Sequence, residues 1–348
     1  MTRPLLGFAL SLAVGLAACS SCCCGRTPKG TPRPVVDARA IRELQKRTHV
    51  VLLGTGTPNA DPARHGPSLA VVAGGRPFLV DCGPGVVRRA AGAHRRGVKA
   101  LKSPMLGTVF LTHLHSDHTA GAPDLVLAPW VLGRKVPLQA FGPPGTAALF
   151  RHLTAAYQQD VQTRLRGLEP AHPEGHKVTA VDKPPGVVYR DADVTVTAFP
   201  ATHGAWKHAY GYRFATRDLH VCVSGDTRPY DAMVSHYRGC DILIHEVYST
   251  TGFRRRPPRW QRYHRASHTS SHELGDIARQ VRPALLVLYH QLFWGSSERE
   301  LLAELRTKYR GPVVSGRDLM LIGVSADFAR GRNGHPHKGS IRAVRLAP

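Results

Sequence analysis

The sequence predicts an α+β fold in which a metal-binding loop follows a buried strand. Short apolar runs at residues 109–111 and 285–288 have the length and composition of buried strands. Residues 146–157 and 297–308 have the length and pattern of helices. Residues 112–118 place four metal-capable side chains directly after the first of these strands. With 348 residues, of which 42% are hydrophobic, the chain can form one large domain with appendages.

The loop at residues 112–118 carries the chemistry of a metal site. His113 and His115 lie two positions apart and can share one ion, whereas Asp117 and His118 are offset and can serve a second. Neutral imidazole and carboxylate are preferred ligands of zinc and related divalent metals. The chain has 20 histidines, so one histidine means little. Four metal-capable residues in this order favour a metal site over a chance polar loop.

The pattern His113-x-His115-x-Asp117-His118 resembles the signature of the metallo-β-lactamase superfamily of dinuclear metal hydrolases. Four other segments resemble the branch that holds ribonuclease Z and bacterial arylsulfatase-like enzymes: residues 53–58, 80–85, 209–213 and 224–227. The similarity extends from about residue 50 to about residue 324. It implies a four-layer αββα sandwich, with two mixed sheets between helices and the metals at one edge of the sheets.

The resemblance also implies a set of seven metal ligands. His113, His115 and His203 would hold one ion, while Asp117, His118 and His290 would hold the other, with Asp226 shared between them. The resemblance implies two Zn²⁺ ions, although iron or manganese accepts similar ligands. Hydroxide formed on the metals would attack phosphorus, sulfur or a carbonyl carbon.

Three residues are candidates for a catalytic role. His268 matches the histidine that would protonate the leaving group, and Glu246 would support it. Asp117 is the third candidate, besides being a predicted ligand. The segment around Glu246 resembles the His-Glu-Ala-Thr element of ribonuclease Z, but Val247 and Tyr248 replace Ala-Thr, so a role tied to that Thr does not carry over.

Asp81 admits two interpretations. It can orient a metal-binding histidine, which is a common task for carboxylates. It can instead cap the helix that follows its strand.

The first residues have the pattern of an export signal. Residues 1–19 comprise a basic start, a short apolar stretch and small residues before Cys19, which indicates a lipoprotein-type signal peptide with lipid attached at Cys19. We expect a flexible tether at 20–48, the hydrolase domain at 49–324 and a basic tail at 325–348. The protein would then be exported and anchored to the cell envelope on the periplasmic side.

The composition is strongly basic, with 47 Lys and Arg against 24 Asp and Glu, a formal charge of +23. Such a surplus attracts nucleic acid, anionic lipid or small anions. We interpret it as a broadly arginine-rich surface without a dedicated partner, because we find no cluster and no aromatic-interleaved stripe. Cys82, Cys222 and Cys240 are expected to pack in the core, and a disulfide among them stays open in an oxidising compartment.

The substrate is inferred from what the chain lacks. Ribonuclease Z cuts precursor tRNA with a flexible arm between the third ligand and the bridging Asp. Here Asp226 follows His203 after only 23 positions, too few for a strand pair plus an arm. Export would also separate the protein from tRNA.

We therefore expect an exported dinuclear-zinc hydrolase of a small anionic ester, either an aryl sulfate or a phosphodiester. One alternative is a ribonuclease Z-like endoribonuclease that processes tRNA 3′ ends, and the other is a non-catalytic metal-binding lipoprotein. Nucleic acid is not the expected partner but stays open. A homodimer is also open, because dimers are common in this branch.

Overall fold

The computed structural model describes residues 38–325 and 340–346. The expected signal peptide, with Cys19, and most of the expected tether lie outside the described residues. Within these two ranges, no helix is long and apolar enough to cross a bilayer. Helix α1 (Ala38–Leu44) buries Ile41 and Leu44 among residues of the first sheet and its helices, so the end of the expected tether packs as part of the folded domain.

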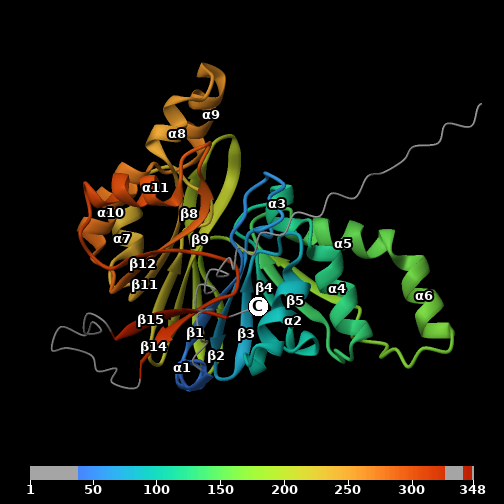
Figure 1. The fold of residues 1–348 in the computed structure, drawn as a ribbon. Coiled ribbons are helices and arrows are strands. Elements are labelled where there is room, and N and C mark those ends of the chain that lie inside the picture. The colour runs from blue at the N-terminus through green and yellow to red at the C-terminus, as the bar shows by residue number, and fades with distance from the viewer. Residues whose placement is uncertain (1–37, 326–339, 347–348) are drawn as a thin grey trace, which may run out of the picture. The chain divides into compact units, whose positions relative to one another are not determined.

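The strands form two mixed sheets (Figure 1). The first sheet contains, in spatial order, β15 (Ile341–Arg345), β14 (Met320–Val324), β1 (His49–Gly54), β2 (Ser68–Ala73), β3 (Arg76–Val80), β4 (Thr108–Phe110), β5 (Leu138–Gly142) and β6 (Val178–Asp182). The second contains β13 (Val313–Ser315), β12 (Leu285–Leu292), β11 (Ile242–Tyr248), β10 (His220–Val223), β9 (Trp206–Thr216), β8 (Val194–His203) and β7 (Gly186–Arg190).

Helices cover the outer face of each sheet. The helices that pack with the first sheet, or extend from it, are α2 (Val86–Arg95), α4 (Ala122–Val131), α5 (Thr146–Ala156) and α6 (Gln158–Arg166), with short turns η1 (Lys99–Leu101) and η2 (Ser103–Met105). The second sheet is covered by α7 (Met233–Tyr237), α10 (Ser271–Val281) and α11 (Glu298–Arg306). This arrangement confirms the expected four-layer αββα sandwich (Figure 1).

The strand sequences explain why both faces are covered. In β1, Val50 and Leu52 join the core between the sheets, whereas Val51 and Leu53 join the core beneath the helices. Successive side chains of a strand point to opposite faces, so a strand buried on both faces reads as a continuous apolar run. Each such side chain contributes roughly 1.5–3 kcal/mol on burial.

Pro129 lies inside α4 without ending the helix. A proline has no backbone N–H, so the carbonyl oxygen of Leu125, four residues earlier, loses its helical donor. The fully buried Arg134 supplies a replacement, because its Nη1 donates to that oxygen at 3.0 Å. Arg134 also donates to the carbonyl oxygen of Val126 at 2.6 Å, so its side chain secures the end of the helix.

The expected basic tail contributes to the sheet. Residues 341–345 form β15, which pairs antiparallel with β14 at the edge of the first sheet. The prediction of an unstructured tail over the whole of 325–348 is therefore wrong for these residues. Leu346 is buried beside the first sheet, which explains why the chain returns to it.

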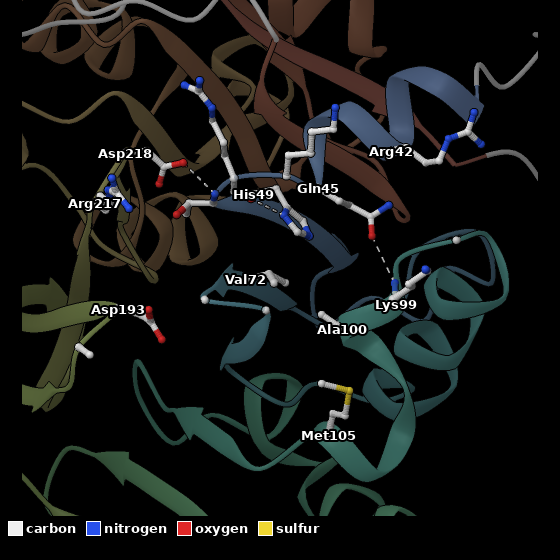
Figure 2. Close-up of a pocket in the computed structure, with 17 residues that line it drawn as sticks. Arg42, Gln45, His49, Val72, Lys99, Ala100, Met105, Asp193, Arg217 and Asp218 are labelled. Carbon is white, nitrogen blue, oxygen red and sulfur yellow. Dashed lines mark hydrogen bonds between the residues drawn. The ribbon is translucent and has the colours of Figure 1, made fainter.

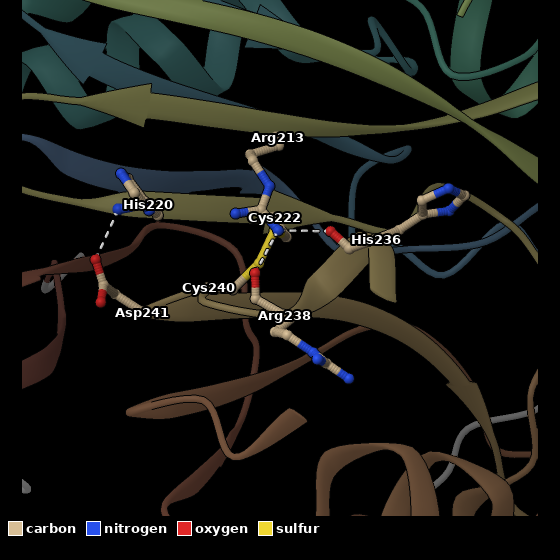
Figure 3. The surroundings of a disulfide bond; sticks show 7 residues. All are labelled: Arg213, His220, Cys222, His236, Arg238, Cys240 and Asp241. Carbon is tan, nitrogen blue, oxygen red and sulfur yellow. Dashed lines mark hydrogen bonds between the residues drawn. A yellow bond between two sulfur atoms is a disulfide. The ribbon is translucent and has the colours of Figure 1, made fainter. Parts of the chain in front are cut away.

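A disulfide joins Cys222 and Cys240 in the second sheet, with a Cα–Cα distance of 6.0 Å (Figure 3). Cys222 lies in β10, and Cys240 stands just before β11, the parallel neighbour of β10. Arg213 donates to the carbonyl oxygens of His236 and Arg238 beside this bond, at 2.6 and 2.7 Å. Cys82 remains a free, buried thiol, as expected for a packing residue.

Candidate metal centre

The seven predicted ligands come from separate segments and meet at one edge of the two sheets. Strand β4 leads into the loop with His113 and His115, and the short helix α3 (Ser116–Thr119) carries Asp117 and His118. His203 ends β8, Asp226 follows β10, and His290 lies in β12. The structure brings together all seven residues, in clusters that could hold a metal ion.

Three histidines form the first cluster, which we name the histidine set: His113, His115 and His203. Nε2 of His113 lies 2.9 Å from Nδ1 of His115, and Nε2 of His203 lies 3.1 Å from the same atom. His113 and His203 are buried, whereas His115 is partly exposed. Three ring nitrogens that converge in this way match the preference of zinc for nitrogen donors.

Asp117, His118 and His290 form the second cluster, which we name the mixed set. Oδ2 of Asp117 lies 3.5 Å from Nε2 of His118 and 3.3 Å from Nε2 of His290. Asp226 stands between the two sets. Its Oδ1 is 3.5 Å from Nε2 of His118, and its Oδ2 is 3.6 Å from His290 and 3.9 Å from His203.

Local backbone features aim two of these side chains. The pairing of β11 with β12 is interrupted so that Glu246 faces Tyr289 and Val247 faces Gln291, which leaves His290 as the extra residue of a bulge with φ of +43°. Bulges re-aim side chains next to functional sites. Gly225 precedes Asp226 with φ of +60°, and a Cβ there would lie 2.5 Å from a backbone oxygen, so only glycine fits.

Hydrogen bonds behind the ligands set the protonation of most rings. Nδ1 of His118 meets Oδ2 of Asp81 at 2.8 Å, Nδ1 of His203 meets the carbonyl oxygen of Ser267 at 2.8 Å, and Nδ1 of His113 meets Oγ1 of Thr112 at 3.0 Å. Each contact favours a proton on Nδ1, which leaves the Nε2 lone pair for a metal.

The same contacts settle the role of Asp81. Besides His118, the carboxylate accepts hydrogen bonds from the backbone N–H and the hydroxyl of Thr112. Helix α2 has Gly85 at its N-cap and no side-chain cap. Asp81 therefore orients a histidine of the site and does not cap the next helix.

His115 is arranged differently. Its Nε2 accepts a hydrogen bond of 2.6 Å from Nε1 of Trp206, which requires the proton of a neutral ring to sit on Nδ1, the atom that faces His113 and His203. A metal ion on Nδ1 requires the opposite tautomer. Sequence reasoning missed Trp206, because a single tryptophan after a strand carries no signal of its own.

Several polar atoms at the centre are buried without a hydrogen-bond partner among the described residues: Nε2 of His118, Oδ1 of Asp226, Oε2 of Glu246, Nδ1 of His268 and Nδ1 of His290. An unsatisfied buried polar group costs about 1–3 kcal/mol, so this concentration is unfavourable unless something else engages these atoms. The donor set, made of imidazole and carboxylate, fits divalent metal ions of the zinc type.

The electrostatics differ between the two sets. Burial, with a contribution from nearby histidines, lowers the pKa of His115 to about 4. Burial likewise lowers the pKa of His203 to about 4. In the mixed set, burial is outweighed by carboxylates: Asp226, Asp81 and Asp117 raise the pKa of His118 well above its usual value, and Asp226 with Asp117 raises that of His290.

The candidate catalytic pair lies against the shared carboxylate. Nδ1 of His268 is 3.4 Å from Oε1 of Glu246 and 3.9 Å from Oδ2 of Asp226. Burial lowers the pKa of His268 to about 4, and burial with the charge of Asp226 raises the pKa of Glu246 well above its usual value. The backbone N–H groups of Thr227 and Thr269 donate to Oε1 of Glu246 and fix its position.

The larger cavities of the described residues are not all at this centre. One of about 1260 Å³ lies at the opposite ends of the strands, lined by residues such as His49, Val72, Lys99 and Asp218 (Figure 2). It contains none of the metal-capable clusters. A smaller cavity of about 330 Å³ opens directly on His115 and His203, and Trp206 and Tyr263 line it with them. Chemistry therefore points to the smaller cavity.

A second feature missed by sequence reasoning lies beside this cavity. Helices α8 (Thr250–Arg254) and α9 (Pro258–Ser267) carry six arginines between Arg254 and Arg265. The interpretation of the arginines as scattered, without interleaved aromatics, is therefore wrong for this segment. A charge count within a short window would have found it, whereas the whole-chain composition concealed it.

Comparisons with known proteins agree with this geometry. Residues 76–291 match the family described as the Beta-lactamase superfamily domain. Ribonuclease Z of Mycobacterium sp. (strain KMS) is 35% identical over 285 residues, which cover 79% of this chain and 95% of that protein. Ribonuclease Z of Mycobacterium bovis (strain BCG) is 33% identical over 284 residues, covering 79% and 98%.

Solved structures share the fold. The metallo-beta-lactamase fold protein YhfI from Bacillus subtilis has a TM-score of 0.61 at 20% identity and covers 78% of this chain and 97% of its own. The short form of human tRNase Z has a TM-score of 0.56 at 21% identity and covers 78% and 98%. On the family match and the identity to these relatives, the chain belongs to the metallo-β-lactamase superfamily, in the branch that contains ribonuclease Z.

Proposed function

We propose that the protein is a metal-dependent phosphodiesterase that cleaves RNA in the manner of ribonuclease Z, with two zinc ions as its cofactors. The observation that carries the proposal is the convergence of the histidine set and the mixed set on one shared carboxylate, Asp226. The curated relatives named Ribonuclease Z support a phosphodiester substrate.

The residues of the two sets would hold the ions, with Asp226 between them. Bound divalent ions would lower the pKa of a water molecule and stabilise negative charge on the phosphoryl oxygens. Hydrolysis joins the oxygen of water to phosphorus, breaks the bond from phosphorus to the leaving oxygen, and requires a proton for that oxygen. Asp117 lies at the partly open side of the mixed set, where it would also orient the attacking water.

His268 is the proposed donor of the proton. Its Nδ1 faces the carboxylates of Glu246 and Asp226, which leaves Nε2 for the leaving oxygen. Because burial lowers the pKa of His268 to about 4, the ring is neutral near pH 7. The approach of an anionic phosphodiester favours the protonated form, and Glu246 would then balance the new charge.

The small-ester hydrolase expected from the sequence is the second candidate. Its support is the segment from His203 to Asp226, which β9 and β10 fill without an inserted arm. The comparisons favour the ribonuclease Z alternative over the aryl sulfate substrate that we expected, because the curated relatives carry that name.

We also propose that the protein is exported and held at the envelope by lipid on Cys19. The disulfide between Cys222 and Cys240 supports this location, because disulfides persist mainly in oxidising compartments. In that case its RNA substrate would be one that reaches the envelope. Metabolic labelling with palmitate should mark the wild-type chain and not a Cys19→Ser variant. Labelling of neither would exclude the lipid anchor.

The activity is tested with the zinc-loaded full chain and three substrates: precursor tRNA, bis-p-nitrophenyl phosphate and p-nitrophenyl sulfate. We expect turnover of the two phosphodiesters, lost on metal removal and in a His113→Ala variant. Turnover of the sulfate alone would instead establish the small-ester candidate. Absence of all three activities, in protein that binds about two metals per chain, would overturn both candidates.

A further inference from the structure

Helices α8 and α9 form a dense positive patch next to the metal centre, seen at the upper end of the second sheet in Figure 1. Between Glu246 and Glu273 the chain contains no acidic residue. Its arginines in this segment are Arg254, Arg255, Arg256, Arg259, Arg262 and Arg265. Within the described part of the chain, none of the six forms an ion pair with a carboxylate. Their charge is therefore not neutralised within the domain.

Two large aromatic side chains are exposed among these arginines. Trp260 is 39% exposed and Tyr263 is 41% exposed, with their ring centres 5.8 Å apart. Arg259, Arg262 and Tyr263 follow the helical spacing of three and four residues, so they share one face of α9. Exposed aromatic rings beside unpaired guanidinium groups suit a partner that is both anionic and planar.

The patch is joined to the metal centre by direct contacts. The carbonyl oxygen of Ser267, at the end of α9, accepts from Nδ1 of His203, and that of Ala266 accepts from the N–H of Gly204. Tyr263 then lines the 330 Å³ cavity together with Trp206 and His115. A ligand lying along the exposed face of α9 would therefore reach the histidine set through this cavity.

We propose that α8 and α9 hold a single strand of RNA and lead it to the metal centre. The inference rests on the proposed function, in which RNA is the substrate. Arginines would bind the phosphates, and bases would stack on Trp260 and Tyr263, while the cavity beside Trp206 receives the nucleotide next to the scissile bond. Stacking of this kind requires unpaired bases, which favours a single strand over a duplex.

A lipid surface fits the patch less well. Helices that lie on membranes bury an apolar face rich in Leu, Phe or Trp. The exposed residues of α9 are mainly Arg259, Arg262, Tyr263, Arg265 and Ala266, with Trp260 as the one large apolar group. Its apolar residues otherwise face the domain, where His264 packs on Trp260 and Trp294.

The test measures binding without cleavage. The full chain in EDTA is titrated into a fluorescent single-stranded oligouridylate of about 12 nucleotides, a length within the usual span of single-strand sites. Affinity is followed by anisotropy between about 0.05 and 0.2 M salt. We expect the double variant Arg259→Ala/Arg262→Ala to bind roughly tenfold more weakly, with a log–log salt slope shallower by about 1.4, as two lost phosphate contacts predict for a single strand.

The control is Arg95→Ala/Arg151→Ala, which removes the same charge from exposed positions of α2 and α5. It should leave the salt slope unchanged. Tyr263→Ala should weaken binding roughly fivefold or more, whereas Tyr263→Phe, which keeps the ring, should restore it. Circular dichroism of each variant verifies folding, and Arg259→Gln/Arg262→Gln replaces the alanine pair if that pair unfolds.

The outcomes separate this inference from the proposed function. Arginine-dependent RNA binding by a protein that hydrolyses no phosphodiester would support the track and refute the activity. Hydrolysis by a protein whose RNA affinity responds equally to both arginine pairs would refute the track alone. Binding to vesicles containing phosphatidylserine, with no binding to RNA, would also overturn it.

Discussion

The histidine set and the mixed set lie within one centre but differ in charge. Three imidazoles with no carboxylate of their own form the first, and burial keeps them neutral. The second places two imidazoles against carboxylates, which favour the protonated rings. A metal ion binds only the deprotonated ring, so it must displace protons in the mixed set but not in the histidine set. Similar residues at one site can therefore bind metal with unlike pH dependence.

The shared carboxylate provides the strongest test of this comparison, because Asp226 faces both sets. Asp226→Asn removes the charge between the ions, and we expect kcat/KM for a phosphodiester to fall by about 10³ or more, as expected when several kcal/mol of metal-based stabilisation are lost. Metal analysis should give fewer than two ions per chain. The control is Asp124→Asn, a carboxylate that pairs with Arg88 on the surface. A variant that kept two ions and full activity would contradict a shared role.

Acidification should empty the two sets in sequence. The raised pKa values of His118 and His290 mean that their protons compete with metal as the pH falls through and below neutrality. His115 and His203, with pKa values near 4, stay neutral until the pH approaches that value. Metal content after equilibration at each pH should pass through a plateau of one ion per chain. Loss of both ions in a single step would show that the sets are not distinct.

Two hydrogen bonds behind the ligands should sharpen the difference. Asp81→Asn removes the acceptor of the His118 Nδ1 proton, and we expect metal affinity of the mixed set to fall by about 10–100-fold, the usual effect of such partners. Thr112→Val removes the hydroxyl that meets Nδ1 of His113, and it should weaken mainly the histidine set. Chelator titrations would distinguish the two steps. Equal weakening of both steps by both variants would argue against separate control.

The smallest effect is expected at Trp206. Its indole N–H favours the His115 tautomer that cannot bind metal through Nδ1. Trp206→Phe removes this competition, and one neutral hydrogen bond of about 1 kcal/mol corresponds to roughly fivefold tighter binding at the histidine set. In the wild type, indole fluorescence should change as metal binds, and the change should be absent in the variant. Unchanged fluorescence in the wild type would mean that the hydrogen bond survives metal binding.

How far the site could be predicted depends on the spacing of its residues. His113, His115, Asp117 and His118 lie in one loop, so their chemistry is visible in the sequence. His203, Asp226 and His290 are far apart along the chain and were selected only by resemblance to the family. Their convergence requires both sheets and, for His290, a bulge in β12 that no local pattern indicates.

The sequence by itself determined the α+β class, the metal-binding loop and the superfamily, because apolar periodicity and adjacent ligands are local properties. Tertiary structure decided the role of Asp81, the pairing of Cys222 with Cys240 and the position of the arginines of α9 beside His203. The physical reason is that each of these depends on which strand or helix lies next to another. The packing of two sheets against each other fixes those neighbours, and residue order along the chain does not.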